Sequence, residues 1–275
     1  MVRPTLYERV QRKITEGFRS GMFALGWNVT EQSNPAEVLA LIQRLRPQDC
    51  GIDLIRVGGN KDGGYLIPND LEGIEYCFSP GVSDLSDFED HLANLHIKSF
   101  LADYSVDSPP VTTPELIFEK KYLGATDLHP YITLASWKEK FLKDYSGDLL
   151  LQMDIEGFEI DVILNTPGKL LDQFRIMVIE FHNMDRLFDP FALRVFQSCF
   201  DKLTEFFHVV HIHPNNYHKS VKKNGVEVPM TMEFTFLNKR RVKSTKPQLV
   251  FPHKLDFDNT GRKPLRLPKC WYCAD

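Results

Sequence analysis

Two hydrophobic segments of the chain each end in a pair of ionisable residues. Asp154 and Glu156 end one apolar run, and Glu180 and His182 end the next such run along the chain. Side chains two positions apart on a strand point in the same direction, so we expect all four groups to meet in one crevice. Carboxylates on a buried strand are costly unless they are paired, hydrogen-bonded or used in chemistry. The alternative is that these groups cap helices and bind loop backbone.

These four residues suit two kinds of chemistry. The unperturbed pKa of a histidine side chain suits a general base, so His182 could remove a proton from an attacking hydroxyl. Asp154 or Glu180 could orient His182 in this role. We therefore predict that Asp154, Glu156 and His182 are catalytic. Alternatively, Asp154, Glu180 and His182 could hold Mg²⁺ or Mn²⁺, which would lower the pKa of a hydroxyl. The sequence leaves both mechanisms open.

A glycine turn and a following acid suit a nucleoside cofactor. Gly81 lies between a predicted strand and a predicted helix, which Ser83 or Asp84 could cap. Asp103 ends the next strand 22 positions later, close to the spacing of about 20 at which an acid reaches a ribose diol. The G-x-G-x-x-G pattern of dinucleotide sites is absent here. A cofactor without phosphates that carries an amino-acid tail fits better, which points to S-adenosylmethionine.

The glycine-rich segment just upstream could bind the amino-acid tail of that cofactor. Its sequence, RVGGNKDGGYL over residues 56–66, places polar side chains among exposed backbone. A simple hairpin is the alternative. The predicted cofactor-binding residues are Asp62, Gly63, Gly64, Tyr65, Ser79, Gly81, Ser83, Asp84 and Asp103.

A third polar group follows a later strand. His213, Asn215 and Asn216 have side chains that can form hydrogen bonds with sugar hydroxyls, so we predict that they bind the substrate. A lone histidine at such a place would usually be structural.

The elements that must position these residues alternate between strand and helix patterns, which predicts a mostly parallel sheet with helices on both faces. We therefore predict an α/β, Rossmann-like fold with seven strands. The predicted strands are Tyr76–Phe78, Ser99–Asp103, Ile117–Lys121, Leu149–Ile155, Ile176–Phe181, Val209–His213 and Met230–Leu237.

The chain of 275 residues, 43% hydrophobic, is long enough for one large domain with additions at its ends. We predict an N-terminal helical extension over 1–50, the α/β domain over 51–240 and an irregular tail over 241–275. Apolar spacing predicts helices at Tyr7–Phe18 and Pro35–Leu45, the second capped by Asn34, and we expect both to pack over a domain edge. The apolar segment Gly21–Trp27 could instead cover a ligand pocket, shield a dimer interface or sit on a membrane surface.

Composition excludes several classes of protein. The net charge of −4 provides no general basic field, so we expect no nucleic-acid partner. The five cysteines are odd in number and scattered, and Cys270 and Cys273 lack a second pair for a zinc site, which favours a reducing compartment. No run approaches the roughly 18 apolar residues of a membrane span, and no signal peptide is recognisable. We expect a cytoplasmic protein without a transmembrane segment.

The ordered motifs resemble those of the FkbM-type methyltransferases, a branch of the class I, Rossmann-like S-adenosylmethionine enzymes. The resemblance covers about Ile52–Leu237, although the turn Pro80–Ser83 departs from the commoner x-G-x-G form. It implies a seven-stranded sheet ending in an antiparallel strand, and O-methylation of sugars or secondary metabolites. The motifs are GGNKDGGYL (58–66), FSPGVSDLSDFE (78–89), TL (133–134), MDIEGFE (153–159), EFH (180–182), HPNNY (213–217) and EFTF (233–236).

The predicted function is therefore S-adenosylmethionine-dependent O-methylation of a hydroxyl on a sugar, glycan or related small metabolite, within a methyltransferase domain over 51–240. Three alternative acceptors are a protein, a lipid and an aromatic compound. The alternative of a different class is a catalytically silent methyltransferase-like module that only binds. The sequence does not indicate the oligomeric state.

Overall fold

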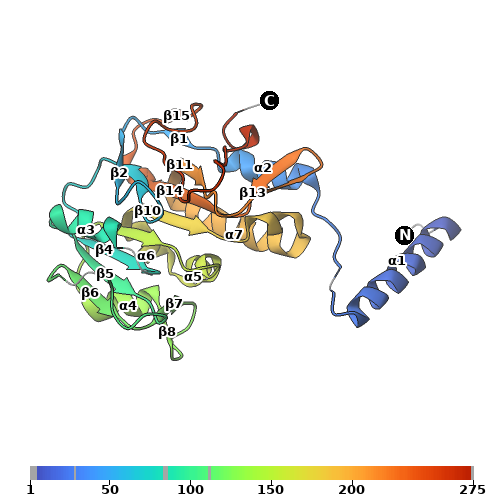
Figure 1. The fold of residues 1–275 in the computed structure, drawn as a ribbon, viewed down its shortest axis with the longest axis horizontal. Coiled ribbons are helices and arrows are strands. Elements are labelled where there is room, and N and C mark those ends of the chain that lie inside the picture. Colours follow the sequence, from blue (N-terminus) through green and yellow to red (C-terminus); the bar gives the residue numbers. More distant parts are fainter. Residues whose placement is uncertain (1–4, 28, 83–85, 111–112, 274–275) are drawn as a thin grey trace.

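The computed structural model describes residues 5–27, 29–82, 86–110 and 113–273. Its centre is a seven-stranded sheet in the order β11-β14-β10-β9-β4-β5-β6 (Figure 1). Strand β14 runs antiparallel to both of its neighbours, and every other pairing in this sheet is parallel. The predicted Rossmann-like α/β fold is confirmed. The seven strands are β4 (Tyr76–Pro80), β5 (Lys98–Ala102), β6 (Leu116–Glu119), β9 (Leu149–Met153), β10 (Phe174–Phe181), β11 (Phe207–Pro214) and β14 (Met232–Asn238).

Different elements pack against the two faces of this sheet. Met177 and Ile179 of β10 belong to a core with α2, α4, α5, α6 and α7, whereas Ile176 and Val178 face α3 and the hairpin β2–β3. Both faces are apolar, which explains why β9 and β10 are continuously hydrophobic. These covering elements are α2 (Pro35–Arg44), α3 (Asp87–Asn94), α4 (Leu134–Leu142), α5 (Glu159–Asn165), α6 (Gly168–Gln173), α7 (Pro190–Phe206), β2 (Leu54–Val57) and β3 (Tyr65–Pro68).

Several shorter elements lie outside the seven-stranded sheet. They are the pairs β1 (Gln48–Asp49) with β15 (Lys246–Pro247), β7 (Tyr122–Gly124) with β8 (Tyr131–Thr133) and β12 (Ser220–Lys223) with β13 (Val226–Pro229), and the 3-10 turns η1 (Met184–Phe188), η2 (Lys239–Arg241) and η3 (Lys269–Trp271).

The order of the strands reverses between β4 and β9, because the chain proceeds from β4 to β5 and β6 on one side and from β9 to β10 on the other. In open α/β sheets, ligands bind outside the carboxyl ends of the strands at such a reversal. The two strand ends are adjacent here, since Asp154 N donates to Pro80 O at 3.4 Å.

The N-terminal helices differ from each other. Helix α2 packs into the core through Val38, Leu41 and Ile42, as predicted, and the Asn34 side chain accepts a hydrogen bond from Ala36 N. Helix α1 (Leu6–Ala24) instead projects from the body (Figure 1). The prediction that the helix at Tyr7–Phe18 packs over a domain edge is wrong, because Val10, Ile14 and Phe18 are exposed. The large apolar side chains of Gly21–Trp27 are exposed as well. Periodicity determines that a helix is amphipathic, but not what covers its apolar face.

The C-terminal tail is irregular but closely packed. Trp271 is fully buried, donates from Nε1 to Glu227 O and lies against Phe234. Among the described residues, no helix combines the length and the apolar character that crossing a membrane requires.

Candidate active site

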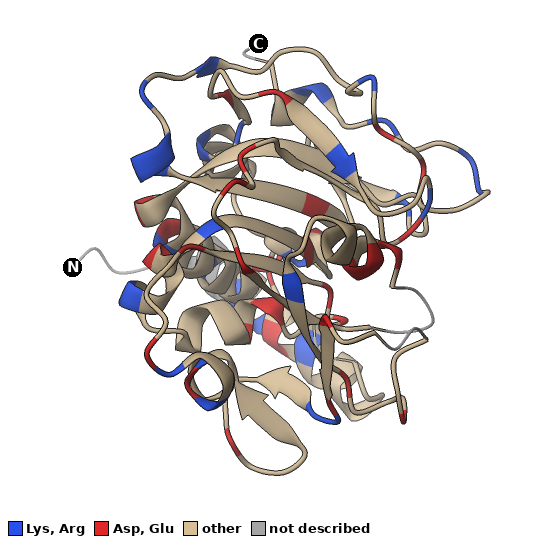
Figure 2. Ribbon diagram, turned by 90° about the vertical axis from the view of Figure 1, so that its left-hand side faces the viewer, with Lys and Arg blue, Asp and Glu red and all other residues tan. Residues whose placement is uncertain are grey.

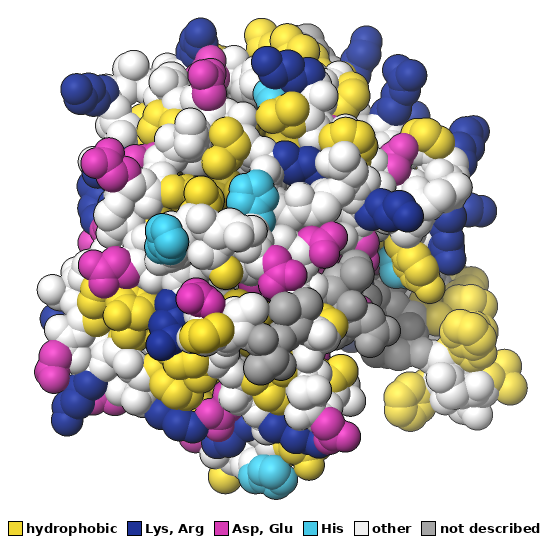
Figure 3. Space-filling view, turned by 60° about the vertical axis from the view of Figure 1, so that its left-hand side comes forward, with side chains coloured by type: hydrophobic (Ala, Val, Ile, Leu, Met, Phe, Trp, Pro, Cys, Tyr) yellow, Lys and Arg dark blue, Asp and Glu magenta, His cyan; other side chains and the backbone are white. Residues whose placement is uncertain are grey.

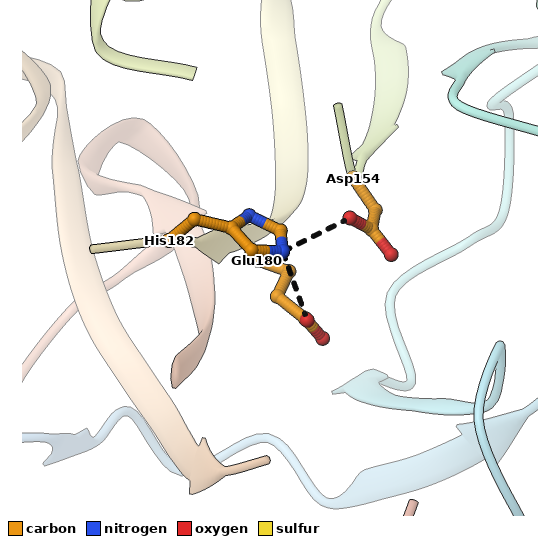
Figure 4. Close-up of side chains that lie close together, drawn as sticks. All are labelled: Asp154, Glu180 and His182. Carbon is orange, nitrogen blue, oxygen red and sulfur yellow. Dashed lines mark ion pairs between the residues drawn. The ribbon is translucent and has the colours of Figure 1, made fainter. Parts of the chain in front are cut away.

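Three ionisable side chains meet at the carboxyl ends of β9 and β10 (Figure 4). His182 Nε2 lies 3.8 Å from Asp154 Oδ1 and 3.6 Å from Glu180 Oε1. Glu156 Oε2 lies 3.5 Å from the same nitrogen. The structure therefore brings together all four groups that end the two hydrophobic segments, and their chemical roles remain predictions.

The path of the chain after β9 differs from the expected extended strand. The strand ends at Met153, and Glu156 adopts a left-handed conformation with φ of 57° just before Gly157. The Asp154 side chain is consequently 24% exposed, whereas that of Glu156 is 89% exposed. The prediction that these two side chains share one strand face is wrong, because the turn breaks the alternation on which it rested.

Glu159 is the residue that orients His182. Its Oε1 lies 3.0 Å from His182 Nδ1 and accepts hydrogen bonds from Ile155 N at 3.2 Å and Gly157 N at 3.0 Å. Because a carboxylate accepts, Nδ1 carries the hydrogen and Nε2 faces the acidic cluster. The prediction that Asp154 or Glu180 orients His182 therefore differs from the structure, where Glu159 contacts Nδ1. Glu159 lies within the MDIEGFE motif and begins α5. Its closeness in sequence to Asp154 and Glu156 could have indicated that it belongs to the same site.

Glu180 is held by a different partner. Asn215 Nδ2 lies 3.0 Å and 3.3 Å from its two carboxylate oxygens. Asn215 is predicted to bind substrate, and this contact shows that it also holds the carboxyl group of Glu180.

The cluster holds more carboxyl groups than basic groups. Burial is the main cause that raises the pKa of Asp154 to about 7, although the neighbouring His182 lowers it. Burial also raises the pKa of Glu180 well above its ordinary value, and the nearby Asp154 and Glu233 raise it further. Burial alone would lower the pKa of His182, but the hydrogen bond and charge of Glu159 and the other carboxylates raise it overall.

No ion pair among the described residues joins Asp154, Glu156, Glu159 or Glu180 to a lysine or arginine. Figure 2 shows acidic and basic residues interspersed over loops, helices and strands. In addition, Asp154 Oδ1 is buried without a hydrogen-bond partner. Such a site favours a ligand that brings positive charge or a proton.

A hollow beside this cluster is lined by some of the residues predicted to bind the cofactor, but not by Gly64, Ser79 or Asp103. Its lining includes Asp62, Gly63, Tyr65 and Gly81, together with Asp154. These predicted cofactor-binding residues and the predicted catalytic residue Asp154 therefore lie next to one another. Ser83 and Asp84 lie outside the described residues.

Two of the glycines in this region are required by the fold itself. Gly81 has φ of +90°, and a Cβ there would lie 1.5 Å from Asp154 O. A Cβ on Gly64 would lie 2.0 Å from Gly59 O inside the hairpin loop. Close approach of backbone to backbone explains both residues without a ligand.

Asp103 lies next to the Gly81 turn. Gly81 N donates to Ala102 O at 3.0 Å, which places the turn beside the end of β5. Asp103 Oδ1 accepts hydrogen bonds from Ser105 N at 2.7 Å and Ser105 Oγ at 2.6 Å. Among the described residues, Oδ2 has no protein partner and is the oxygen available to a ligand.

A buried polar network adjoins the hollow, and the sequence pointed to its members Tyr65 and Ser79 but not to Glu89 or Gln152. Ser79 Oγ contacts Glu89 Oε1 and lies 2.6 Å from Gln152 Oε1, and Gln152 Nε2 donates to Tyr65 Oη at 3.3 Å. A hydroxyl has one hydrogen, so a protonated Glu89 that donates to Ser79 satisfies the chain of contacts. Burial raises the pKa of Glu89 to about 7, which agrees with this assignment.

The C-terminal tail also reaches this region. Asn259 Nδ2 donates to Glu233 Oε1 at 2.6 Å and to Asp62 Oδ1 at 3.1 Å, which connects β14 to the glycine-rich loop. Asn216 holds the backbone of Thr260 through hydrogen bonds of 2.9 and 3.0 Å. Its predicted substrate contact therefore competes with a structural role. His213 is buried, and its Nε2 has no hydrogen-bond partner among the residues that the structure describes.

Comparisons with known proteins place this geometry in context. No family model matches the sequence, and no curated protein matches it. A fibrillarin/Nop5p complex is similar at 15% identity, over 61% of this chain and 74% of that chain, with a TM-score of 0.36.

Two further solved structures are similar at 11% identity. One is a putative DNA modification methyltransferase encoded within an E. coli prophage, over 60% of this chain and 47% of that chain with a TM-score of 0.36. The other is the Burkholderia thailandensis 1,6-didemethyltoxoflavin-N1-methyltransferase with bound S-adenosylhomocysteine, over 86% and 91% with a TM-score of 0.30. Similarity at this level assigns neither a family nor an activity.

The buried carboxyl group of Glu89 predicts a pH-dependent stability. Below its ordinary pKa of 4.5 both the folded and the unfolded protein hold the proton. As the pH rises towards 7, only the unfolded protein releases it, so the free energy of unfolding falls. Glu89→Gln should abolish this loss, and the variant should gain about 3 kcal/mol relative to wild type across this interval.

Denaturant unfolding at a series of pH values measures that difference. Glu139→Gln, on the exposed side of α4, is the matched control and should show no such dependence. A constant difference between Glu89→Gln and wild type at all pH values would contradict a raised pKa of Glu89.

Proposed function

We propose that this chain is an S-adenosylmethionine-dependent O-methyltransferase that acts on a hydroxyl of a sugar, glycan or related small metabolite. The observation that carries the proposal is the placement of Asp103 and the Asp154–His182 cluster on opposite sides of the reversal in strand order. A nucleoside held by Asp103 would reach towards His182. The resemblance of the motifs to FkbM-type enzymes is part of this proposal.

The electrostatics of the site support this cofactor over a dinucleotide. S-adenosylmethionine carries a sulfonium and an ammonium, and both are stabilised by the surplus of carboxylates around Asp154. A dinucleotide would bring anionic phosphates into the same field. In the proposed complex Asp103 Oδ2 binds the ribose, and the loop with Asp62 and Tyr65 binds the amino-acid tail.

The proposed reaction uses the hydrogen bond that fixes His182. With Nδ1 donating to Glu159, Nε2 is free to accept the proton of the acceptor hydroxyl. The oxygen then attacks the methyl carbon in line with the sulfur, so the O–CH₃ bond forms as the S–CH₃ bond breaks. The products are the methyl ether and S-adenosylhomocysteine.

A divalent cation is a second candidate component of this site. One ligand atom each from Asp154, Glu180 and His182 lies within 4.8 Å of the others. The Nδ1–Glu159 contact also resembles the carboxylate–histidine pairs that support metal ligands. Mg²⁺ or Mn²⁺ bound there would lower the pKa of the acceptor hydroxyl.

Other acceptors and a silent binding role are the competing functions. A protein, lipid or aromatic acceptor would use the same cofactor, whereas a silent module would bind it without turnover. We further propose that the enzyme works in the cytoplasm, since all five cysteines are free.

Asp103→Ala should weaken cofactor binding. Wild-type protein should bind S-adenosylmethionine and S-adenosylhomocysteine with micromolar affinity in calorimetry. Loss of the charged hydrogen bonds to the ribose should reduce that affinity by about tenfold or more. Asp107→Ala, which alters a highly exposed carboxylate nearby, is the control and should bind normally. Equal affinities for the Asp103 variant and wild type would remove Asp103 from the cofactor site.

His182→Ala and Asp154→Asn should lose methyl transfer by about 10²-fold or more, the scale of a removed general base. Both should still bind the cofactor. The assay follows labelled methyl groups from S-adenosylmethionine into a panel of sugars and other small hydroxyl compounds. His208→Ala, at the opposite end of β11, is the control. Normal turnover in both site variants would exclude this mechanism, and cofactor binding without turnover on any acceptor class would favour the silent module.

Removal of divalent cations tests the metal. If Asp154, Glu180 and His182 hold an ion, excess chelator should abolish turnover at saturating substrate, and Mg²⁺ or Mn²⁺ should restore it. Full activity in chelator would eliminate the metal and leave His182 as the base.

A further inference from the structure

Helix α1 presents an apolar face that the body of the protein does not cover. Val10, Ile14 and Phe18 follow one another at intervals of four residues, so they lie on one side of the helix. More large apolar side chains follow at its C-terminal end. The exposed fractions are 50% for Val10, 67% for Ile14, 59% for Phe18, 75% for Phe23, 75% for Leu25 and 66% for Trp27.

The connection to the body leaves this face free. The chain rejoins the domain where Thr30 Oγ1 donates to Asp189 Oδ2 at 2.8 Å and Ser33 N donates to Phe188 O at 2.8 Å. Helix α1 therefore stands apart from the sheet and its covering helices (Figure 1). In the space-filling view, the part that projects at the lower right is covered largely by hydrophobic side chains (Figure 3).

The polar side of α1 is basic. Its described side chains include Arg12, Lys13 and Arg19, with Glu16 as the acidic residue. Arg12 and Glu16 form an ion pair, but both are well exposed, and such pairs contribute little. The helix thus carries net positive charge, although the whole chain has a formal charge of −4.

These features together identify the occupant of the apolar face. A basic polar side opposite the apolar face of Val10, Ile14 and Phe18, followed by exposed Phe, Leu and Trp side chains at the C-terminal end, is the composition of helices that lie in the plane of a membrane surface. The basic residues would be attracted to anionic headgroups. We propose that α1 docks on the surface of an anionic lipid bilayer, with Val10, Ile14, Phe18 and Trp27 inserted among the lipids.

The three tryptophans make this proposal directly measurable. Trp137 and Trp271 are fully buried, whereas Trp27 is 66% exposed. Insertion into lipid should therefore shift the fluorescence of Trp27 alone to shorter wavelength. The experiment mixes the full chain with vesicles of phosphatidylcholine, with and without phosphatidylserine, and follows both this shift and co-flotation.

We expect binding to the phosphatidylserine vesicles that weakens with added salt, because the basic side chains are screened. The double variant Ile14→Asp, Phe18→Asp should lose at least about tenfold in vesicle affinity for each apolar side chain replaced. Val250→Asp, which alters an equally exposed side chain on the tail, is the matched control and should bind as wild type does. Cofactor binding should be unchanged in all three proteins, so this proposal and the proposed function can fail separately.

Two results would overturn the proposal. One is the absence of flotation and of any Trp27 shift with anionic vesicles at low salt. The other is a concentration-dependent dimer in light scattering that the double variant abolishes, since a second copy of the chain would then cover the apolar face.

Discussion

The carboxylate of Glu159 joins three parts of the active-site region, and the geometry of the cluster depends on it. One oxygen accepts from Ile155 N and Gly157 N and also contacts His182 Nδ1. These contacts fix the turn after β9, the start of α5 and the orientation of the imidazole together. Because the turn is fixed, Asp154 remains next to Pro80 and Gly81 at the reversal in strand order, and it lines the hollow that adjoins the acidic cluster.

Charge is the second constraint on the site. Burial, and then repulsion from neighbouring carboxylates, keep the pKa values of Asp154 and Glu180 high, and none of the described lysines or arginines pairs with either residue. A protein bears that cost most readily where a ligand offsets it. A sulfonium cofactor, a proton shared with His182 and a divalent cation all meet this requirement, whereas a phosphate-bearing cofactor does not.

The glycine-rich loop depends on a segment far away in the chain. Asn259 connects Asp62 to Glu233, and Arg56 donates to Gly59 O at 2.7 Å from within the same hairpin. The tail therefore belongs to the structural support of the site, although its sequence shows no periodic pattern. Its irregular backbone is held by side-chain hydrogen bonds and by burial of Trp271, neither of which produces a repeat in sequence.

The sequence by itself determined the Rossmann-like sheet, because runs of buried strands alternate with helices, and it placed Asp103, Asp154, Glu180 and His182 at carboxyl ends of strands. Only the tertiary structure decided which acid orients His182, because the left-handed turn at Glu156 redirects the chain and brings Glu159 to the imidazole. It likewise decided that α2 is covered while α1 is not. Hydrophobic spacing indicates which face of a segment is apolar. Which part of the protein packs against that face depends on turns and on contacts between residues far apart in the chain.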